Sequence, residues 1–430
     1  MKREHIWVPI AVLVVLIIAL APKTLSAKEI VRPEEIKSMR QVVYGHETYV
    51  KLAQLWKEYF NQYPSEYAYA NWMYAARYAG DRKYSELLTK GLRKYAANPT
   101  LLYLKALAHC GAHNDKEGRK YLERAIALDP NCTDAWFSLV VLYMDSGDED
   151  RLNLALRHLL ESGIIADEVM DYNYNVLVSL EDNAILITNG DNDTFPGWIL
   201  TRILKVRPDV TIVNRSLLNS DWYPMYVIEQ GLPRFISRSE LDGLRNSILQ
   251  ETKAKDAGSY SGGLFGDTLI LRIIESAKRA GRPVYLAKTV NAMDKLQEVA
   301  EEGRELGLVT LVTPSQVSYA EQLRKVYGKW IEAFRTGGLE SWRLRHASQA
   351  DAGRRLVSNY PQGMAINLES LKKNAPELRI KLFHWHIEHI EKVLPEEFRD
   401  RMAQAWCCSA SDVKEIDEWC KEQGLKCRKQ

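Results

Sequence analysis

Residues 49–162 carry apolar side chains at helical spacing and never alternate them as a strand would. Three turn signals interrupt this stretch: Tyr63-Pro64, Asn98-Pro99 and Asp129-Pro130. They lie 35 and 31 residues apart. Because a single helical hairpin of this length cannot bury its apolar face, hairpins at such a period must stack on their neighbours. The first half of the chain is therefore predicted to be an all-α array.

One copy of this pattern is especially regular. It reads YLERAIALDPNCTDAWFSLVVLYMDSGDED, from Tyr121 to Asp150. Its small and aromatic residues fall where a tetratricopeptide repeat packs its two helices: Ala125, Trp136, Leu139, Tyr143 and Gly147. Residues 41–163 thus resemble about three tetratricopeptide repeats. The resemblance implies either a structural spacer or a groove that binds a partner protein or peptide, and both remain open.

The N-terminus has the pattern of an export segment. Lys2 and Arg3 precede an apolar run from Ile6 to Ala21. The run is slightly long for a signal core and slightly short for a membrane span of about 20 residues. Leu25-Ser26-Ala27 offers only a mediocre cleavage site. Residues 1–27 are predicted to be a retained transmembrane anchor or a cleaved signal. Either one places the bulk of the chain outside the cytoplasm, at the cell membrane or secreted.

The cysteines are compatible with an exported protein, whereas the net charge is uninformative about location. Four of the six cysteines cluster near the C-terminus: Cys407, Cys408, Cys420 and Cys427. No C-x-x-C pair suggests zinc, so disulfides that hold the last helix are predicted, with buried free thiols as the alternative. The formal net charge of +2 gives no reason to expect a nucleic-acid partner.

After Gly163 the pattern changes to strands alternating with helices. Short apolar runs predict strands at 184–188, 209–214, 283–289 and 308–312, with helices near 198–206, 268–280 and 295–305 between them. This order predicts a small, mostly parallel sheet in an α/β module at residues 168–315. Residues 316–430 read as a helical C-terminal region. The predicted fold class is therefore α plus α/β.

The loop after the first predicted strand is the best candidate site, in AILITNGDNDTFPGW. Because parallel strands place their carboxyl ends at one edge, the loops after the first two strands should meet there. Together they supply the candidate ligand-binding residues Asn189, Asn192, Thr194, Asn214, Asn219, Asp221, Trp222 and Tyr223.

The two carboxylates of this loop have two interpretations. Asp191 and Asp193 could hold a divalent cation, Mg²⁺, Mn²⁺ or Ca²⁺, through oxygen. They could instead accept backbone N–H groups at the start of the next helix, with Pro196 in its first turn. The second interpretation is slightly favoured, because capping needs no ligand.

Four segments carry a second resemblance: TNGDNDTFPGW, VRPDVTIVNRSLLNSDWY, GRPVYLAKTV and GLVTLVTP. From about Asn183 to Tyr360 the chain is similar to the soluble C-terminal region of multi-pass membrane proteins common in Bacteroidetes. Their membrane part groups them with protein O-mannosyltransferase-like glycosyltransferases. This chain lacks that multi-pass part, so the resemblance implies a recurring extracytoplasmic module and no transferase activity.

Together these features predict a membrane-anchored, extracytoplasmic tetratricopeptide repeat protein that binds or scaffolds partner proteins in a bacterial cell envelope. The alternative is an enzyme, or an enzyme subunit, that acts on glycans or phosphorylated lipids with a cation at Asp191 and Asp193. A role without catalysis is favoured, since no signature of a hydrolase or metalloprotease is present.

Overall fold

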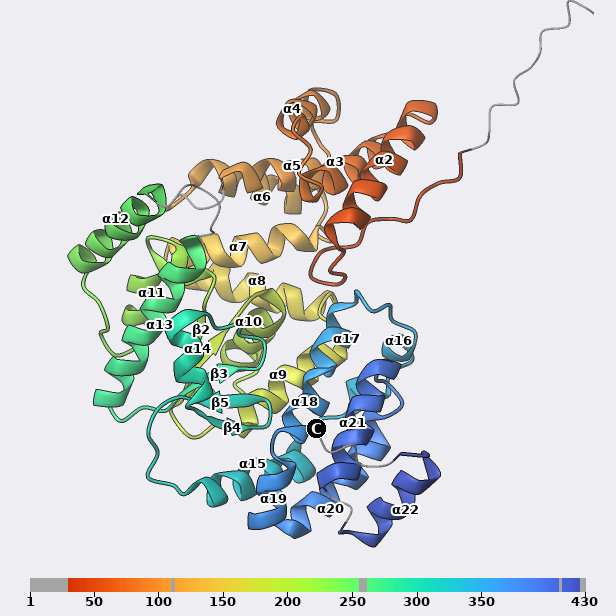
Figure 1. The fold of residues 1–430 in the computed structure, drawn as a ribbon. Helices are drawn as coiled ribbons and strands as arrows, with labels where there is room; N and C mark the ends of the chain where they lie inside the picture. The colour runs from red at the N-terminus through yellow and green to blue at the C-terminus, as the bar shows by residue number, and fades with distance from the viewer. Residues whose placement is uncertain (1–29, 110–112, 255–260, 410–411, 426–430) are drawn as a thin grey trace, which may run out of the picture.

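The computed structural model of the chain describes residues 30–109, 113–254, 261–409 and 412–425. Stacked helices form the upper part of the molecule, a small sheet with flanking helices lies below them, and the C-terminal helices cover the lower right (Figure 1). The predicted export segment, residues 1–27, lies outside the described residues. Within the described ranges, no helix combines the length and apolar character that crossing a membrane requires.

The upper part is an array of α2 (His46–Gln62), α3 (Glu66–Tyr78), α4 (Tyr84–Lys94), α5 (Pro99–Ala106), α6 (Lys116–Leu128), α7 (Thr133–Asp145) and α8 (Glu149–Glu161). The turn residues seen in the sequence begin these helices. Asn98 caps α5 by accepting the Leu101 N–H, and Pro99 is the first helical residue. Consecutive helices pack against each other, most extensively in the pairs α2–α3, α5–α6 and α7–α8, and α3 also contacts α4. The predicted hairpins are present, while their assignment to tetratricopeptide repeats stays a prediction.

The sheet has five strands among the described residues, in the order β2-β1-β3-β5-β4. Their bounds are β1 (Ile185–Thr188), β2 (Thr211–Asn214), β3 (Val284–Ala287), β4 (Arg304–Leu306) and β5 (Val309–Leu311). β1 pairs in parallel with β2 and β3, whereas β5 is antiparallel to both β3 and β4. The sheet is therefore mixed, and the expectation of a mostly parallel sheet holds only for the first three strands.

The difference arises at β4, which the sequence assigned to the end of a helix. That helix, α14 (Asp294–Glu301), ends earlier, and the chain then forms a tight β4–β5 hairpin in which Leu306 pairs with Val309. Gly307 in the loop has φ +69°, a conformation that glycine adopts without strain. The apolar run at 308–312 is thus the return strand of a hairpin.

The other elements of this layer are α9 (Asp167–Ser179), α10 (Asp191–Trp198), the π-turn η2 (Ile199–Ile203), η3 (Leu217–Asn219), α11 (Tyr223–Glu229), α12 (Arg238–Ala254) and α13 (Ser261–Arg279). Helices α9 and α10 lie on one side of the sheet and α13 on the other (Figure 1). Right-handed crossovers require this, because β1 leads to one neighbour and β2 leads back past β1 to β3.

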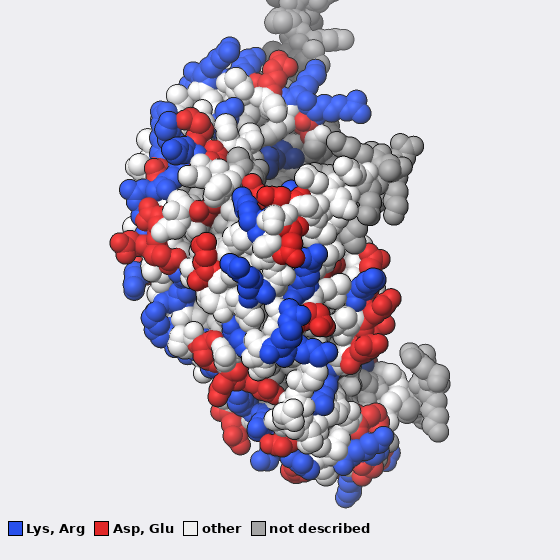
Figure 2. Space-filling model, turned by 90° about the vertical axis from the view of Figure 1, so that its left-hand side faces the viewer, with Lys and Arg blue, Asp and Glu red and all other residues white. Residues whose placement is uncertain are grey.

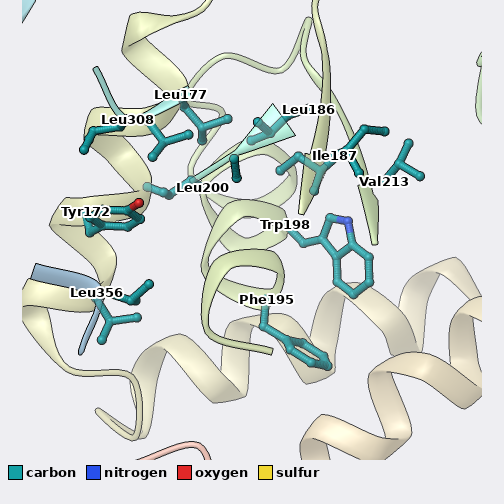
Figure 3. Close-up of a cluster of buried hydrophobic side chains, with 14 of the residues drawn as sticks. Tyr172, Leu177, Leu186, Ile187, Phe195, Trp198, Leu200, Val213, Leu308 and Leu356 are labelled. Carbon is teal, nitrogen blue, oxygen red and sulfur yellow. The ribbon is translucent and has the colours of Figure 1, made fainter. Parts of the chain in front are cut away.

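A shared hydrophobic core joins the sheet to the array. Side chains from β1, β2, α9 and α10 gather beneath the sheet (Figure 3). Phe195 of α10 meets Phe137 of α7 edge to face, with ring centroids 4.9 Å apart. Trp198 packs against Phe195 from the same helix. The α/β layer is therefore fixed to the array through buried aromatic rings.

The C-terminal region is helical, as predicted: α15 (Tyr319–Ala333), η4 (Gly337–Glu340), α16 (Trp342–Arg345), α17 (Ala352–Val357), α18 (Asn359–Ala365), α19 (Leu368–Asn374), α20 (Pro376–Trp385), η5 (His386–Ile390), α21 (Glu396–Ser409) and α22 (Lys414–Glu422). A disulfide between Cys407 and Cys420 joins α21 to α22. Cys408 is disulfide-bonded as well. The predicted covalent anchoring of the last helix is confirmed.

Candidate functional site

Asp193 is the third residue of α10, and its side chain caps the N-terminus of this helix. Its Oδ2 accepts the Asn189 N–H at 2.7 Å and its Oδ1 accepts the Gly190 N–H at 2.9 Å. The Thr289 hydroxyl, from the loop after β3, also donates to Oδ2. Burial raises the pKa of this carboxyl group, and the N–H and hydroxyl donors act in the opposite direction. Asp193 thus joins the loops after β1 and β3.

Pro196 lies deeper in α10 than predicted. The helix begins at Asp191, so Pro196 follows the first turn and its ring nitrogen cannot bond the Asn192 carbonyl. Asn173 of α9 supplies the missing donor, because its Nδ2 lies 2.9 Å from that carbonyl oxygen. The expectation of a first-turn proline is therefore corrected, and the backbone of Asn192 has a structural partner.

The loops after β1 and β2 meet, as the strand order predicted. The Asn214 carboxamide donates to Thr194 Oγ1 at 2.8 Å, and Thr194 in turn lies 2.6 Å from Thr188 Oγ1. The Tyr223 hydroxyl accepts the Asn214 backbone N–H at 3.0 Å. These four polar residues are buried or nearly so and bond one another. At this edge of the sheet they therefore form a hydrogen-bonded network within the protein.

The remaining candidates are spread around this edge. Asn189 accepts from Arg215, which forms an ion pair with Asp267 at 2.6 Å. Asn219 holds the Gly266 N–H at 3.1 Å. Trp222 packs edge to face on Tyr223, and the backbone carbonyl of Asp221 accepts from Arg238. These are contacts between elements of the fold.

Asp191 has a different partner from Asp193. Its Oδ2 lies 3.0 Å from Nε of Arg40, which comes from the segment before α2. The Asp191 side chain is 38% exposed, whereas that of Arg40 is 12% exposed. The two carboxylates of the loop therefore face separate partners. Within the described residues, no group of three or more His, Cys, Asp and Glu side chains is placed to hold a metal ion, and the cation stays a prediction.

Arg40 also contacts the helical array. Its Nη1 lies 2.8 Å from Asp134 Oδ1 on α7 and 3.3 Å from the Tyr103 hydroxyl on α5. Its guanidinium also lies over the Phe137 ring, 4.8 Å from the centroid. Burial alone would lower the pKa of Arg40, but Tyr103, Asp191 and Asp134 raise it well above its usual range. Arg40 is thus a buried cation between the array and the α/β layer.

Residues 34–43, which we call the strap, lie along the inner helices α3, α5 and α7. Asn71 Oδ1 accepts the Ile36 N–H at 3.0 Å, and the Tyr74 hydroxyl accepts the Met39 N–H at 3.3 Å. At its end the strap forms an antiparallel bridge between Val42 and Asp351, beside α17. In Figure 1 this segment lies between the lower end of α2 and α17. Side chains of the array therefore bind the main chain of the strap.

A cavity of about 760 Å³ remains between the strap and the inner helices. Asn71 and Tyr74 of α3, Thr100 and Tyr103 of α5 and Asp134 of α7 line its wall. We call this wall, with its cavity, the groove. Such a volume is within the range of ligand-binding pockets. A second cavity, of about 710 Å³, lies between α12, α13 and α14, and residues 189–194 line neither of the two.

The sequence did not single out the groove residues, although a signal was present. Asn71 and Tyr74 are three residues apart and so share one face of α3, in which most of the other side chains are apolar or aromatic. Ranking such residues requires knowing which face is concave, and that depends on how the hairpins stack. Arg40 lies far in sequence from both of its carboxylate partners, so no local pattern reveals it.

The fold and groove define a helical array joined to a mixed α/β layer, with a cavity of about 760 Å³ on the array. The family model described as TMEM260-associated domain 2 matches residues 169–230, from α9 to the end of α11. The match includes the two loops at the carboxyl edge and connects this part of the chain with a family of membrane proteins. No curated protein matches the chain.

Proposed function

We propose that this chain is an exported helical-repeat protein whose groove binds a segment of a partner protein in the cell envelope. The observation that carries the proposal is the way the groove holds the strap. Asn71 and Tyr74 accept main-chain N–H groups, which any peptide offers whatever its sequence. A wall that binds backbone in this way suits an unfolded or irregular segment of another protein.

Two further observations support an exported location. The Cys407–Cys420 disulfide is typical of a protein that folds in an oxidising compartment. The matched domain is associated with a membrane protein family. With residues 1–27 as anchor or signal, the groove would face the extracytoplasmic side, and with an anchor α2 would begin close to the membrane.

The surface charge is compatible with a protein partner. Acidic and basic side chains are interspersed on the face shown in Figure 2. This agrees with the formal net charge of +2 and gives no extended basic surface there for a nucleic acid. Mixed charge of this kind favours contacts that depend on local complementarity.

The proposal can be tested by blocking the groove. Thr100 lines the cavity, and Thr100→Arg would place a long cationic side chain into it. Thr89 is exposed on α4, so Thr89→Arg makes the same change outside the groove. Peptides selected from a random library on the full-length chain should bind the Thr89→Arg variant as they bind the unmodified chain. They should bind the Thr100→Arg variant at least about tenfold more weakly, a loss of about 1.4 kcal/mol.

Equal binding to both variants would contradict the proposal, because the selected peptides would then bind elsewhere. Selection of no peptide above background, either from the full-length chain or from its variant with Ser38→Ala and Arg40→Ala, two strap residues that bond Asp134, would also contradict it. Circular dichroism and thermal melting of both variants establish that the comparison is between folded proteins.

A further inference from the structure

The strap forms hydrogen bonds to the groove through its side chains as well as through its backbone. Ser38 Oγ donates to Asp134 Oδ1 at 2.6 Å, and Arg40 Nη1 donates to the same oxygen at 2.8 Å. Tyr74 donates its hydroxyl proton to Asp134 Oδ2 at 3.0 Å. Asp134 is thus an acidic centre of the groove that binds a hydroxyl group and a guanidinium group two residues apart.

The local conformation of the strap makes this double contact possible. The N–H groups of Gln41 and Val42 both bond the Ser38 carbonyl, so residues 38–42 form a turn. The Ser38 hydroxyl also accepts the Arg40 N–H at 3.2 Å. The turn places both side chains on the same side, toward α7.

We infer that the strap is an intramolecular ligand of the groove, and that a partner segment with a Ser-x-Arg turn displaces it by binding Asp134. This rests on the proposed function and names the class of partner and the regulation of the same site. A tethered segment acts at a high effective concentration. It therefore lowers the apparent affinity of any competing segment without needing strong contacts of its own.

The charges of the groove favour a basic partner. The wall that the array contributes to the cavity includes the carboxylates of Glu66 and Asp129, and neither forms an ion pair within the described residues. The cationic side chains of the lining are Lys37 of the strap and Arg343, and Arg343 is paired with Asp351. A segment rich in Lys and Arg around the Ser-x-Arg turn would complement this lining.

Arg40 gives the displacement a second consequence. The same guanidinium pairs with Asp191 at the start of α10, so removing the strap releases that carboxylate. Asp191 is the exposed partner of the pair and lies outside the groove wall. It therefore offers a way to weaken the strap without altering the groove.

The test uses the full-length chain and a fluorescent peptide with the sequence of residues 33–43, PEEIKSMRQVV. The unmodified chain should bind it weakly, because its own strap fills the groove. A variant with Ser38→Ala and Arg40→Ala should bind it at least about tenfold more tightly, since the strap leaves the groove free in a larger fraction of its molecules. The matched peptide PEEIKAMAQVV should lose that gain, and adding Asp134→Asn to the strap variant should abolish it.

A milder change covers the case in which the double variant does not fold. Asp191→Asn leaves the groove wall intact and should strengthen peptide binding about threefold. Equal affinity of the unmodified chain and both variants would overturn the inference while leaving peptide binding by the groove in place. Binding that does not depend on Ser and Arg of the peptide would overturn the partner class. Failure of groove binding itself is recognised separately, by the comparison of Thr100→Arg with Thr89→Arg.

Discussion

Arg40 lies between two carboxylates from different parts of the fold, Asp134 in the array and Asp191 at the start of α10. The two pairs differ in exposure, and so in energy. Asp134 is 13% exposed and Asp191 is 38% exposed. Removing one partner from a buried pair leaves an uncompensated charge, whereas an exposed pair is weakened by water and salt.

We therefore predict unequal losses of stability at these positions. Arg40→Ala should lower the free energy of unfolding by roughly 3 kcal/mol, because Asp134 loses its cation in a largely buried place. Asp191→Asn should lower it by less than about 1 kcal/mol. Urea denaturation followed by circular dichroism measures both. Equal losses would contradict the prediction, because they would mean that the Asp134 pair adds nothing to the stability that the Asp191 pair gives.

Asn173 provides a second prediction, through the carbonyl that Pro196 leaves without a donor. Asn173→Ala should lower the free energy of unfolding by about 2 kcal/mol, since the Asn192 carbonyl would lose its partner. In a Pro196→Ala background the loss should be smaller, because alanine restores a backbone N–H inside α10. A double-mutant cycle measures this coupling, and strict additivity of the two changes would contradict it.

Among the elements, the disulfide between α21 and α22 stabilises the C-terminal end of the chain. It closes a loop with a sequence separation of 13 residues. Replacing Cys407 and Cys420 together by alanine should lower stability by about 3 kcal/mol. Hydrogen exchange should show α22 losing protection before α20. If α22 stays protected to the same extent, packing and not the disulfide holds the helix.

The short π-helix η5 contains a buried histidine that couples stability to pH. Burial lowers the pKa of His386 from 6.5 to about 4. Between these values the unfolded chain binds more protons than the folded chain, so stability falls as pH falls from 6.5 to 4. The total loss from this group is roughly 3 kcal/mol.

His386→Phe should flatten the pH dependence of the melting temperature in that window. His384 is exposed and pairs with Glu415, so His384→Gln serves as a control that keeps the slope. An unchanged slope in His386→Phe would show that other groups cause the acid sensitivity. His386 is 1% exposed, so its imidazole is well shielded from water.

Local pattern was sufficient for most elements and failed where contacts are distant. The hairpins followed from proline and asparagine turn signals, and β1, β2 and β3 followed from short apolar runs. β4 was not foreseen, because three residues beside a helix carry no periodicity of their own. The meeting of Asp193, Thr194 and Asn214 followed from parallel strand order. The pairing of Asp191 with Arg40 did not, since it depends on where the strap crosses the array.

At the scale of the whole molecule, the strap contacts each major part of the fold. It lies in the groove of the array, pairs through Arg40 with the loop after β1, and bridges through Val42 to Asp351 near α17. An anchor in residues 1–27 would lie directly upstream of it. Occupation of the groove by a partner would therefore loosen the connection between the predicted anchor and all three parts.

Hydrogen–deuterium exchange on the full-length chain, with and without a selected peptide, tests groove binding most directly. The Ile36 and Met39 amides bond to Asn71 and Tyr74, so their exchange reports whether the strap is in place. We predict faster exchange at residues 36–39 when peptide binds, together with slower exchange in α3, α5 and α7. Protection around Asp193 with an unchanged strap and array would contradict a peptide-binding groove.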